Sequence, residues 1–460
     1  MTKLKKFLAK LSQYQNIHVV GASGTEGSEI AIFLHKHTTQ KITLHDYANS
    51  PETFRQNFNS SHASLPKDTA NSKWQKLQNL PNTLNLSSNY LKEIEDADLI
   101  FVPQSWYLYP QNSKLHALKD KIPFSSMTRL YLELFEGTTI GITGSNGKST
   151  TTALIYHLLK SHYPHAVSIV GNDRRTPQLL ESLESFTPQD LLVLEISNRQ
   201  LVDTEGVSPQ IAVLTNITEN HLAEHKNFAE YIYYKSRIFL YQSASDHAIL
   251  NANDPVSLSL QDKVPSTLTF FKNLDPKIQY PNFTLSGAHN AQNLSAAIEV
   301  AHLFNISDAQ INDSLSSFSP LPGRAEIIRK TPDLIFINDR QGTATDATIK
   351  AIQSLRGNIT LIFGGINKGM PTEKLCEVIR QFNVLPIGIQ SPFIDECAPQ
   401  LPTMIKSSTL SEAVHLACEK TTKPGTIIFS PACEYGPYFS STPGHPDAEN
   451  FAAIVKNLPI

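Results

Sequence analysis

The chain has 460 residues, 40% of them hydrophobic and 18% charged, so it carries enough apolar material for ordinary cores. Its length predicts about three domains, and its formal net charge of −3 offers no basic surface for a nucleic-acid partner. No apolar run approaches the roughly 18 residues that a membrane span needs, and the four cysteines form no C-x-x-C pair. We therefore expect a cytoplasmic protein without a disulfide framework. We also expect a monomer.

The N-terminal part of the chain predicts a doubly wound sheet preceded by a helix. Lysines interrupt the apolar positions of residues 1–11, which favours a short amphipathic surface helix over a signal peptide. An apolar strand then enters a glycine turn, a helix follows, and a second strand ends in an acid, which is the β-α-β order of a Rossmann-like domain. The polar stretch 49–88 indicates helices and loops. The expected strands lie at residues 17–21, 41–46 and 98–103, and the expected helix at residues 28–35.

A phosphate-binding loop is predicted at residues 141–150, GITGSNGKST. A β-prone stretch precedes it and a helical pattern follows it, the arrangement that cradles nucleotide phosphates. The glycines let backbone N–H groups approach phosphate oxygens, Lys148 would reach the β- and γ-phosphates, and the Ser149 hydroxyl would hold magnesium. The core is the shorter G-x-x-G-K-S, because Ile142 stands where the common pattern has glycine. A chance Gly-Lys-Ser in a surface turn is the alternative.

Alternating strands and helices are predicted around this loop, from about residue 136 onward. Apolar β-prone runs indicate the strands, and apolar residues at helical spacing indicate the helices. The expected strands lie at residues 138–143, 191–195 and 211–215, the expected helices at 149–160, 227–241 and 290–304, and further β structure at 243–283.

Three residues of this central block have side chains suited to metal chemistry. Glu195 ends a buried strand, where acids beside a phosphate loop commonly serve magnesium, although a solvated loop acid is the alternative. His221 follows another strand and is either a metal ligand or a structural histidine. Lys235 lies in a largely apolar and aromatic helix, where a lysine usually extends its ammonium group to water. Desolvation would instead favour the neutral amine, which reacts with carbon dioxide to give a metal-binding carbamate.

A further β-α alternation follows the prolines and glycine at residues 320–323, which mark a domain boundary. There a second glycine-lysine loop follows a strand and ends in Lys368, which suits an anionic group; a plain left-handed turn is the alternative. Asp339 ends another strand and could bind ribose hydroxyls or a metal-bound phosphate, or simply cap a helix. The expected strands lie at residues 334–338, 359–363, 384–389 and 426–430, and the expected helices at 346–355 and 373–381.

Taken in chain order, these stretches resemble the motifs of the Mur ligase family over essentially the whole chain. The form of the phosphate loop is typical of the glutamate-adding members. The matching stretches are G-S-N-G-K-S-T at 144–150, L-E-I-S-N-R-Q-L at 194–201, the histidine-to-lysine stretch at 216–235, H-N-A-Q-N at 289–293, L-P-G-R at 321–324, N-D at 338–339, G-G-I-N-K-G at 364–369 and S-P-A-C at 430–433.

The resemblance implies an α/β protein of three domains. These are an N-terminal Rossmann-like domain for a UDP-linked substrate (1–136), a central P-loop ATPase domain with a mostly parallel sheet (137–321), and a C-terminal Rossmann-like domain for an amino acid (322–460). The implied activity belongs to peptidoglycan precursor synthesis: ATP-dependent addition of glutamate, expected to be the D isomer, to UDP-N-acetylmuramoyl-L-alanine. The reaction would pass through an acyl phosphate and release ADP and phosphate.

By position, the resemblance assigns the ATP phosphates to Lys148, one magnesium ion to Ser149 and Glu195, and a second magnesium ion to His221 and a carbamylated Lys235. Lys148, Lys235 and His221 are the implied catalytic residues. The other implied roles are ATP binding by Gly144, Ser145, Asn146, Gly147, Thr150, Asn293, Arg324 and Asp339, and substrate binding by Thr25, Asp46, Asn172, Ser197, Thr343 and Lys368.

Several positions depart from the family pattern, most of them at the amino-acid end. Gln341 replaces a lysine, and Tyr435 replaces a serine that would meet the incoming glutamate. Glu26 occupies a glycine position of the first turn, Asn220 replaces an aspartate, and residues 173–177 are longer and more charged than usual. We expect a rebuilt amino-acid pocket, which leaves the choice between D- and L-glutamate open.

Other functions remain compatible with these motifs. One group comprises another Mur ligase step, an L-glutamate-adding variant, or a ligase similar to folylpolyglutamate synthase, although the N-terminal dinucleotide-like domain argues against the last. A nucleotide-dependent scaffold that has lost amide synthesis is a second class, motivated by the altered C-terminal motifs. The presence of Lys148, Glu195, His221 and Lys235 argues against that class.

Overall fold

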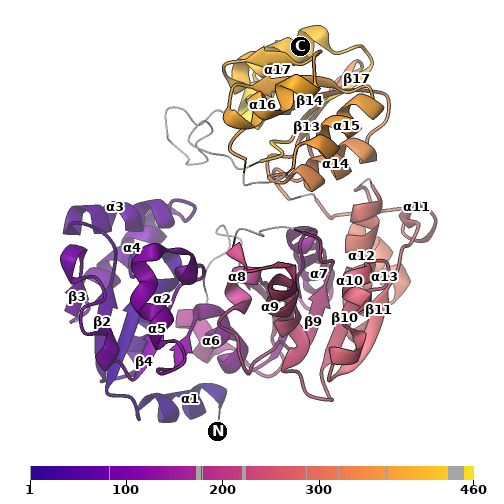
Figure 1. Cartoon of the computed structure of the whole chain (residues 1–460). Coiled ribbons are helices and arrows are strands. Elements are labelled where there is room, and N and C mark those ends of the chain that lie inside the picture. Colours follow the sequence, from indigo (N-terminus) through magenta and orange to yellow (C-terminus); the bar gives the residue numbers. More distant parts are fainter. Residues whose placement is uncertain are drawn as a thin grey trace. The chain divides into compact units, whose positions relative to one another are not determined.

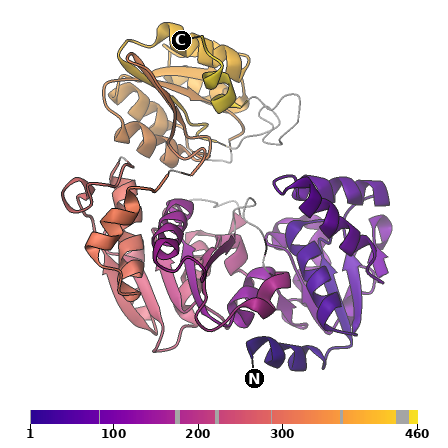
Figure 2. The same ribbon diagram turned by 180° about the vertical axis from the view of Figure 1, so that it is seen from behind.

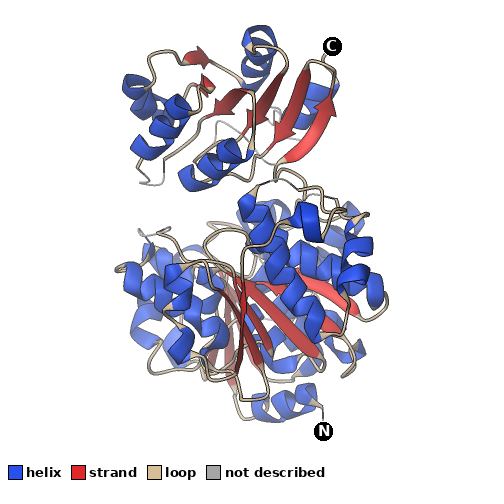
Figure 3. Cartoon of the chain, turned by 90° about the vertical axis from the view of Figure 1, so that its right-hand side faces the viewer, coloured by secondary structure: helices blue, strands red, loops and turns tan. Residues whose placement is uncertain are grey.

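The computed structural model describes residues 2–81, 83–171, 178, 180–219, 224–285, 287–319, 321–367, 371–433 and 450–459. Its backbone contacts divide the chain into two compact units. Unit 1 holds Met1–Lys272 with Asn293–Ile311, and unit 2 holds Asn273–Gln292 with Asn312–Ile460. In both units, strands pack with helices (Figure 3).

The first sheet of unit 1 has five parallel strands in the order β3-β2-β1-β4-β5. This order, with β1 at the centre, is that of a doubly wound sheet. Its strands are β1 (Asn16–Val20), β2 (Lys41–His45), β3 (Thr83–Asn85), β4 (Leu99–Phe101) and β5 (Phe124–Ser125). Its helices, seen in Figure 1, are α1 (Lys3–Leu11), α2 (Thr25–His37), α3 (Pro51–Ser61), α4 (Lys67–Gln78), α5 (Ser113–Leu118) and α6 (Met127–Leu134).

The second sheet of unit 1 has six parallel strands in the order β11-β10-β9-β6-β8-β7. Figure 2 shows helices from the same part of the chain packed beside its strands. Its strands are β6 (Thr138–Thr143), β7 (Val167–Gly171), β8 (Leu191–Glu195), β9 (Ile211–Leu214), β10 (His247–Asn251) and β11 (Thr267–Phe271). The helices that follow along the chain are α7 (Lys148–His162), α8 (Asn198–Leu201), α9 (Phe228–Leu240), α10 (Pro255–Leu258), α11 (Pro276–Gln279), α12 (Ala288–Leu303) and α13 (Asp308–Leu315). Of these, α11, the start of α12 and the end of α13 belong to unit 2.

A single buried cluster joins the two sheets of unit 1. Apolar side chains of β1, such as Val19, belong to the same cluster as Leu192 of β8. Helix α6 connects them, because Leu130, Leu134 and the following Phe135 are all buried within that cluster. Burial of this apolar surface holds the N-terminal sheet against the central one.

The sheet of unit 2 has six strands in the order β12-β13-β17-β14-β15-β16, and only the edge strand β12 runs antiparallel. Separate apolar clusters cover its two faces, as expected for a sheet with helices on both sides. Its strands are β12 (Glu326–Lys330), β13 (Leu334–Asn338), β14 (Asn358–Phe363), β15 (Leu385–Ile389), β16 (Ile405–Ser407) and β17 (Gly425–Phe429). Its helices are α14 (Thr345–Ser354), α15 (Glu373–Gln381), α16 (Pro392–Cys397), α17 (Leu410–Lys420) and α18 (Phe451–Lys456).

The predicted α/β class, with Rossmann-like sheets before and after a central P-loop sheet, is confirmed. The boundaries after residues 136 and 321 remain predictions. The polar stretch 49–88 holds the strand β3, which had been expected to be helix and loop, because three edge residues carry too short a pattern to reveal a strand. Residues 243–283 contain short helices besides β10 and β11. Within the described residues, no helix is long and apolar enough to cross a membrane.

Candidate nucleotide and catalytic site

The predicted phosphate loop joins β6 to α7, and two of its glycines are required by its shape. Gly144 and Gly147 have φ angles of +153° and +86°, which favour residues without a side chain. A Cβ atom on Gly144 would lie 1.9 Å from Thr215 Oγ1, and one on Gly147 would lie 2.3 Å from Asn293 Oδ1. The backbone of this loop therefore approaches its neighbours as closely as a glycine allows.

Side chains from the end of β9 and from the segment after it hold this loop in place. Ser145 Oγ donates to Thr218 O at 3.0 Å and accepts from Thr218 N at 2.9 Å. Asn146 N donates to Asn216 Oδ1 at 2.9 Å, and Thr215 Oγ1 donates to Asn146 O at 2.6 Å. These bonds fix the loop before the N-terminus of α7, where backbone N–H groups and the helix dipole favour an anion.

Two lysines meet at one carbonyl oxygen of the loop. Lys148 Nζ donates to Gly144 O at 2.9 Å and to Ser145 O at 3.0 Å. Lys235 Nζ, from α9, donates to the same Gly144 O at 2.8 Å. Lys235 is only 1% exposed, and burial, reinforced by the charge of Lys148, lowers its pKa well below the usual value. Burial therefore disfavours the ammonium form of Lys235.

Tyr231, one turn before Lys235 on α9, supports both the lysine and the loop. Its ring centroid lies 4.9 Å from Lys235 Nζ, and its hydroxyl lies 3.0 Å from Ser145 Oγ. Burial raises the pKa of this phenol, so it stays protonated. Tyr231 is not among the residues predicted from the sequence, because a tyrosine on an apolar helix has no local feature that marks it as a loop contact.

The predicted magnesium ligands Ser149 and Glu195 lie at the same edge of the central sheet. Glu195 is the last residue of β8 and pairs in register with Ile142 of β6, just before the phosphate loop. Ser149 lies in the first turn of α7, beside Thr150. The Ser149 and Glu195 side chains are 8% and 5% exposed. Among the described residues, no group of three or more His, Cys, Asp or Glu side chains is placed to hold a metal ion.

Two further predicted residues of unit 1 contact this region. Asn293, on α12, accepts a hydrogen bond from Thr151 Oγ1 at 3.3 Å. Ser197 caps α8 in a capping box with Gln200, and its hydroxyl lies 3.3 Å from Gln104 Oε1 in the N-terminal part of the unit. Lys235 and Asn293, from distant parts of the sequence, therefore both lie against the loop, and Glu195 ends the strand that pairs with β6 just before it.

The predicted residues Thr25 and Asp46 lie beside the N-terminal glycine turn, since Thr25 begins α2 and Asp46 follows β2. Asp46 accepts hydrogen bonds from Ser23 N at 2.8 Å and from Ala48 N at 3.0 Å, so part of its hydrogen-bonding capacity shapes the turn. Thr25 Oγ1 donates to the carbonyl of residue 61 at 3.1 Å. Glu26, the unusual acid at a glycine position, accepts from Gln104 N at 2.6 Å. Its carboxylate therefore ties the turn to the segment after β4.

Unit 2 brings Arg324, Asp339 and Thr343 to the end of β13. Asp339 accepts from Ser430 Oγ at 2.8 Å and from Ala325 N at 3.1 Å. Burial raises the pKa of Asp339 to about 6, against the lowering effect of these bonds and of Arg324. Thr343 N donates to Gln341 O at 2.9 Å in the turn that follows. This acid is poised to change its charge near neutral pH.

Three predicted site residues lie outside the described residues: Asn172, His221 and Lys368. The same holds for Tyr435, one of the departures from the family pattern. Their roles remain predictions.

Comparison with known proteins identifies the family of this chain. Residues 142–280 match the Mur ligase middle domain. A UDP-N-acetylmuramoylalanine--D-glutamate ligase from Koribacter versatilis is 32% identical over 76% of this chain and 82% of the relative. Its counterpart from Clostridioides difficile is 32% identical over 64% of this chain and 70% of the relative. The chain belongs to the Mur ligase family. The predicted resemblance is thereby confirmed, and with it the class of ligase.

Solved structures of Mur ligases share the fold. MurF from Acinetobacter baumannii superposes with a TM-score of 0.56 at 17% identity, covering 79% of this chain and 85% of that one. A pseudomurein peptide ligase type C from Methanothermus fervidus gives a TM-score of 0.53 at 18% identity, covering 91% and 97%. The MurF ligase from Thermotoga maritima in complex with ADP gives 0.52 at 18% identity, covering 74% and 87%.

Proposed function

We propose that this Mur ligase uses ATP to join D-glutamate to the alanyl carboxylate of UDP-N-acetylmuramoyl-L-alanine. The proposal rests on one observation: the phosphate loop is held in place by hydrogen bonds, and Lys148 and Lys235 both donate to one of its carbonyl oxygens. The names of the relatives supply the substrates, since they are D-glutamate-adding ligases related to this chain over most of its length. The enzyme would act as a monomer in peptidoglycan precursor synthesis.

The reaction needs activation because a carboxylate is a poor electrophile. An oxygen of the alanyl carboxylate attacks the γ-phosphorus of ATP, the bond to the bridging oxygen breaks, and ADP leaves. The glutamate amine then attacks the acyl carbon and loses a proton, and collapse of the tetrahedral intermediate forms the amide and expels phosphate. Lys148 and the N–H groups at the start of α7 neutralise the negative charge that gathers on the phosphate oxygens.

The residues present fit a magnesium site. Ser149 and Glu195 supply hydroxyl and carboxylate oxygens, the hard ligands that magnesium prefers, at the edge of the sheet where the loop begins. Magnesium bound there would offset charge on the phosphate oxygens. We assign a second ion to His221 and to a carbamylated Lys235.

The surroundings of Lys235 also fit a carbamate. Its buried amine has a lowered pKa, and a neutral amine is the form that attacks carbon dioxide. The product would carry a negative charge beside the Lys148 ammonium, so a neutral amine next to a cation would become an attractive pair of opposite charges. Tyr231 lies beneath this group and would limit its movement.

The other assigned residues divide between nucleotide and substrates. We assign Asn293, Arg324 and Asp339 to ATP, and Thr25 and Asp46 to the uridine diphosphate group. The remaining assignments are Asn172 and Ser197 for the muramoyl part, and Thr343 and Lys368 for glutamate.

One assay tests the proposal. The enzyme is incubated with ATP, magnesium and UDP-N-acetylmuramoyl-L-alanine, with D-glutamate and L-glutamate in separate tubes, and the product mass and phosphate are measured. We expect an amide product with D-glutamate and phosphate release in equal amount. A product only with L-glutamate would replace the stated amino acid. Phosphate release with a pteroate substrate instead would indicate a folate-type ligase, and no product from either substrate would refute amide synthesis.

A further inference from the structure

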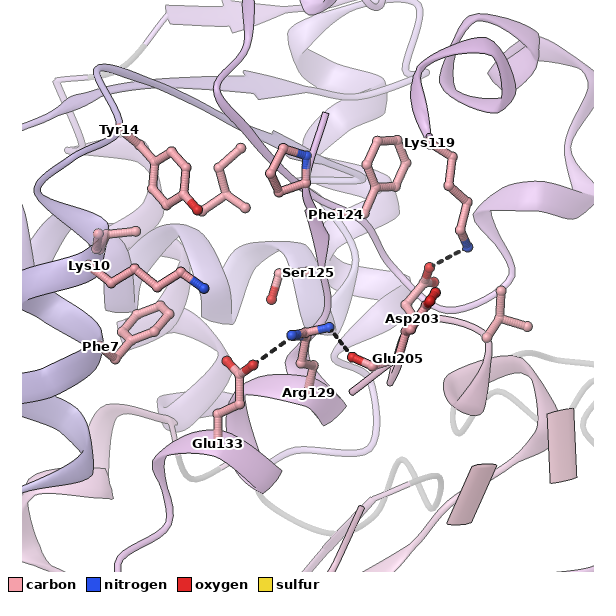
Figure 4. Close-up of a pocket in the computed structure, with 14 residues that line it drawn as sticks. Phe7, Lys10, Tyr14, Lys119, Phe124, Ser125, Arg129, Glu133, Asp203 and Glu205 are labelled. Atoms are coloured by element: carbon pink, nitrogen blue, oxygen red, sulfur yellow. Dashed lines mark hydrogen bonds and ion pairs between the residues drawn. The ribbon is translucent and has the colours of Figure 1, made fainter. Parts of the chain in front are cut away.

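A cavity of about 260 Å³ lies in unit 1, away from every residue assigned above. Its walls come from α1, from the first residues of β4 and β5, from α6, and from the segment after α8 (Figure 4). Leu99 and Phe124, which line it, begin their strands, whereas the turn with Asp46 follows the end of β2. Since all five strands of this sheet are parallel, the cavity and that turn lie at opposite edges.

The walls combine aromatic and charged side chains. Phe7, Tyr14 and Phe124 supply aromatic surface, and Leu11 and Val202 add aliphatic surface. A flat apolar group would find contacts on several sides here. The volume lies below the usual range of about 300–1,000 Å³ for sites that hold drug-sized ligands, so the cavity suits a molecule with one ring.

The carboxylates that line the cavity already have cations. Asp203 accepts from Lys119 Nζ at 2.9 Å, and Glu133 accepts from Arg129 Nε at 2.8 Å. The third carboxylate, Glu205, is 3.4 Å from a guanidinium nitrogen of Arg237 outside the cavity. These acids therefore leave little negative charge unbalanced at the cavity wall.

Three polar groups at the wall retain donor capacity. Within the described part of the chain, Lys10, an exposed residue of α1, has no carboxylate partner. The Ser125 hydroxyl has no hydrogen-bond partner within that part of the chain either; its residue is 6% exposed, and its oxygen is not among the fully enclosed unpaired atoms. Arg129 uses Nε for Glu133 and Nη1 for the carbonyl of Glu205. Its Nη2 group keeps two hydrogens for another acceptor. Figure 4 shows Lys10, Ser125 and Arg129 around the same opening.

We propose that this cavity is a second ligand site that binds a small aromatic carboxylate, with the ring between Phe7, Tyr14 and Phe124 and the carboxylate at Lys10 and Ser125. The geometry that carries this is a cavity with both aromatic and charged walls, whose acids are already paired while Lys10 and the Ser125 hydroxyl are not. An ammonium and a hydroxyl together recognise a carboxylate through charge-assisted hydrogen bonds. The site does not depend on the proposed ligase reaction.

Fluorine NMR of 3-(4-fluorophenyl)propionate, titrated with the full-length protein, tests this site. We expect broadening of the probe signal that persists with saturating ADP and UDP. The neutral 3-(4-fluorophenyl)propanamide should bind about tenfold more weakly, because it lacks the charge that Lys10 recognises. Absence of binding, equal binding of the amide, or displacement by ADP or UDP would overturn the proposal.

Matched variants locate the site. Lys10→Glu should weaken binding of the propionate by about tenfold or more. Lys6→Glu makes the same charge change on an exposed position of α1 that does not line the cavity, and should leave binding unchanged. Ser125→Ala removes only a hydroxyl and should weaken binding several-fold. Equal loss in Lys6→Glu and Lys10→Glu would indicate a general charge effect and refute the site, as would full binding by both Lys10→Glu and Ser125→Ala. Equal thermal midpoints would confirm that the variants are folded.

Discussion

The phosphate loop of unit 1 and the end of β13 in unit 2 both hold ionisable side chains, but different interactions act on those side chains. Around the loop, hydrogen bonds from Thr215, Asn216 and Thr218 fix the backbone, and two lysines share one carbonyl. Around Asp339, one serine and one backbone N–H oppose the effect of burial on the carboxylate. The loop matches its family closely, whereas the turn after Asp339 departs from the pattern at Gln341. Hydrogen bonds thus fix the position of the loop, whereas burial raises the pKa of the Asp339 carboxyl.

Of the variants considered, Lys148→Ala should lower turnover the most. The ammonium group lies at the loop where phosphate charge must be neutralised, so we expect turnover to fall by about a thousandfold. Steady-state phosphate release measures the loss. Lys160→Ala, which removes a lysine from the far end of the same helix, should change turnover less than twofold, about the effect of a surface residue. Equal losses would mean that the helix, and not the charge at the loop, limits the reaction.

Lys235→Ala should lower turnover by about a hundredfold, because it removes a group that we assign to a metal site. Small carboxylates such as acetate should restore part of the activity if a carbamate is the working form. Lys226→Ala, which alters an exposed lysine just before α9, should cause neither loss nor rescue. Unchanged turnover in Lys235→Ala would contradict the assignment of this lysine.

Ser430→Ala tests whether Asp339 of unit 2 must be ionised for activity. The serine hydroxyl stabilises the ionised carboxylate of Asp339, so its removal should raise the pKa of Asp339 further above 6. If ionised Asp339 is needed, activity is lost as the pH falls through this pKa, and the acidic limb of the pH–rate profile should move up by about one unit. Ser407→Ala, which alters a buried serine of β16, serves as the control and should leave the profile in place. A profile that does not move in Ser430→Ala would remove Asp339 from the active form.

Gln341→Lys restores the lysine of the family pattern and should have the smallest effect. Gln341 shapes its turn through backbone bonds, to Gly323 O at 3.0 Å and from Thr343 N at 2.9 Å, which lysine would also make. We expect the KM for glutamate to change by less than about threefold, the range for one partly exposed charge. A tenfold fall in the KM for glutamate would contradict a rebuilt pocket, because it would show that glutamate binding still depends on a lysine at this position.

Sequence patterns predicted the elements that carry strong local signals. The strand and glycine loop at 138–150, the strand β13 and the helix α15 agree with their expected positions to within a residue or two. The strands β12 and β16 were not expected, because edge strands are short and their polar residues face water. Periodicity along the sequence does not show which strand an edge strand will pair with, because that pairing exists only in the assembled sheet.

The candidate site was predictable in its residue types and not in its contacts. The loop, Glu195 and Lys235 follow from motif and strand order, because carboxyl ends of parallel strands gather at one edge. The sharing of Gly144 O by two lysines and the support from Tyr231 depend on how α9 packs against β6 and β9. That packing joins residues nearly a hundred positions apart, which no local pattern specifies.

The buried cluster around α6 has a consequence for cutting the molecule. Leu130, Leu134 and Phe135 lie in one core with side chains of both sheets of unit 1. A fragment that began at residue 137 would leave Leu192 and its neighbours without that cover, and exposed apolar surface of this kind promotes aggregation. The N-terminal and central sheets should therefore unfold in one cooperative transition. A boundary that is natural along the sequence is, in this protein, a poor place to divide the chain.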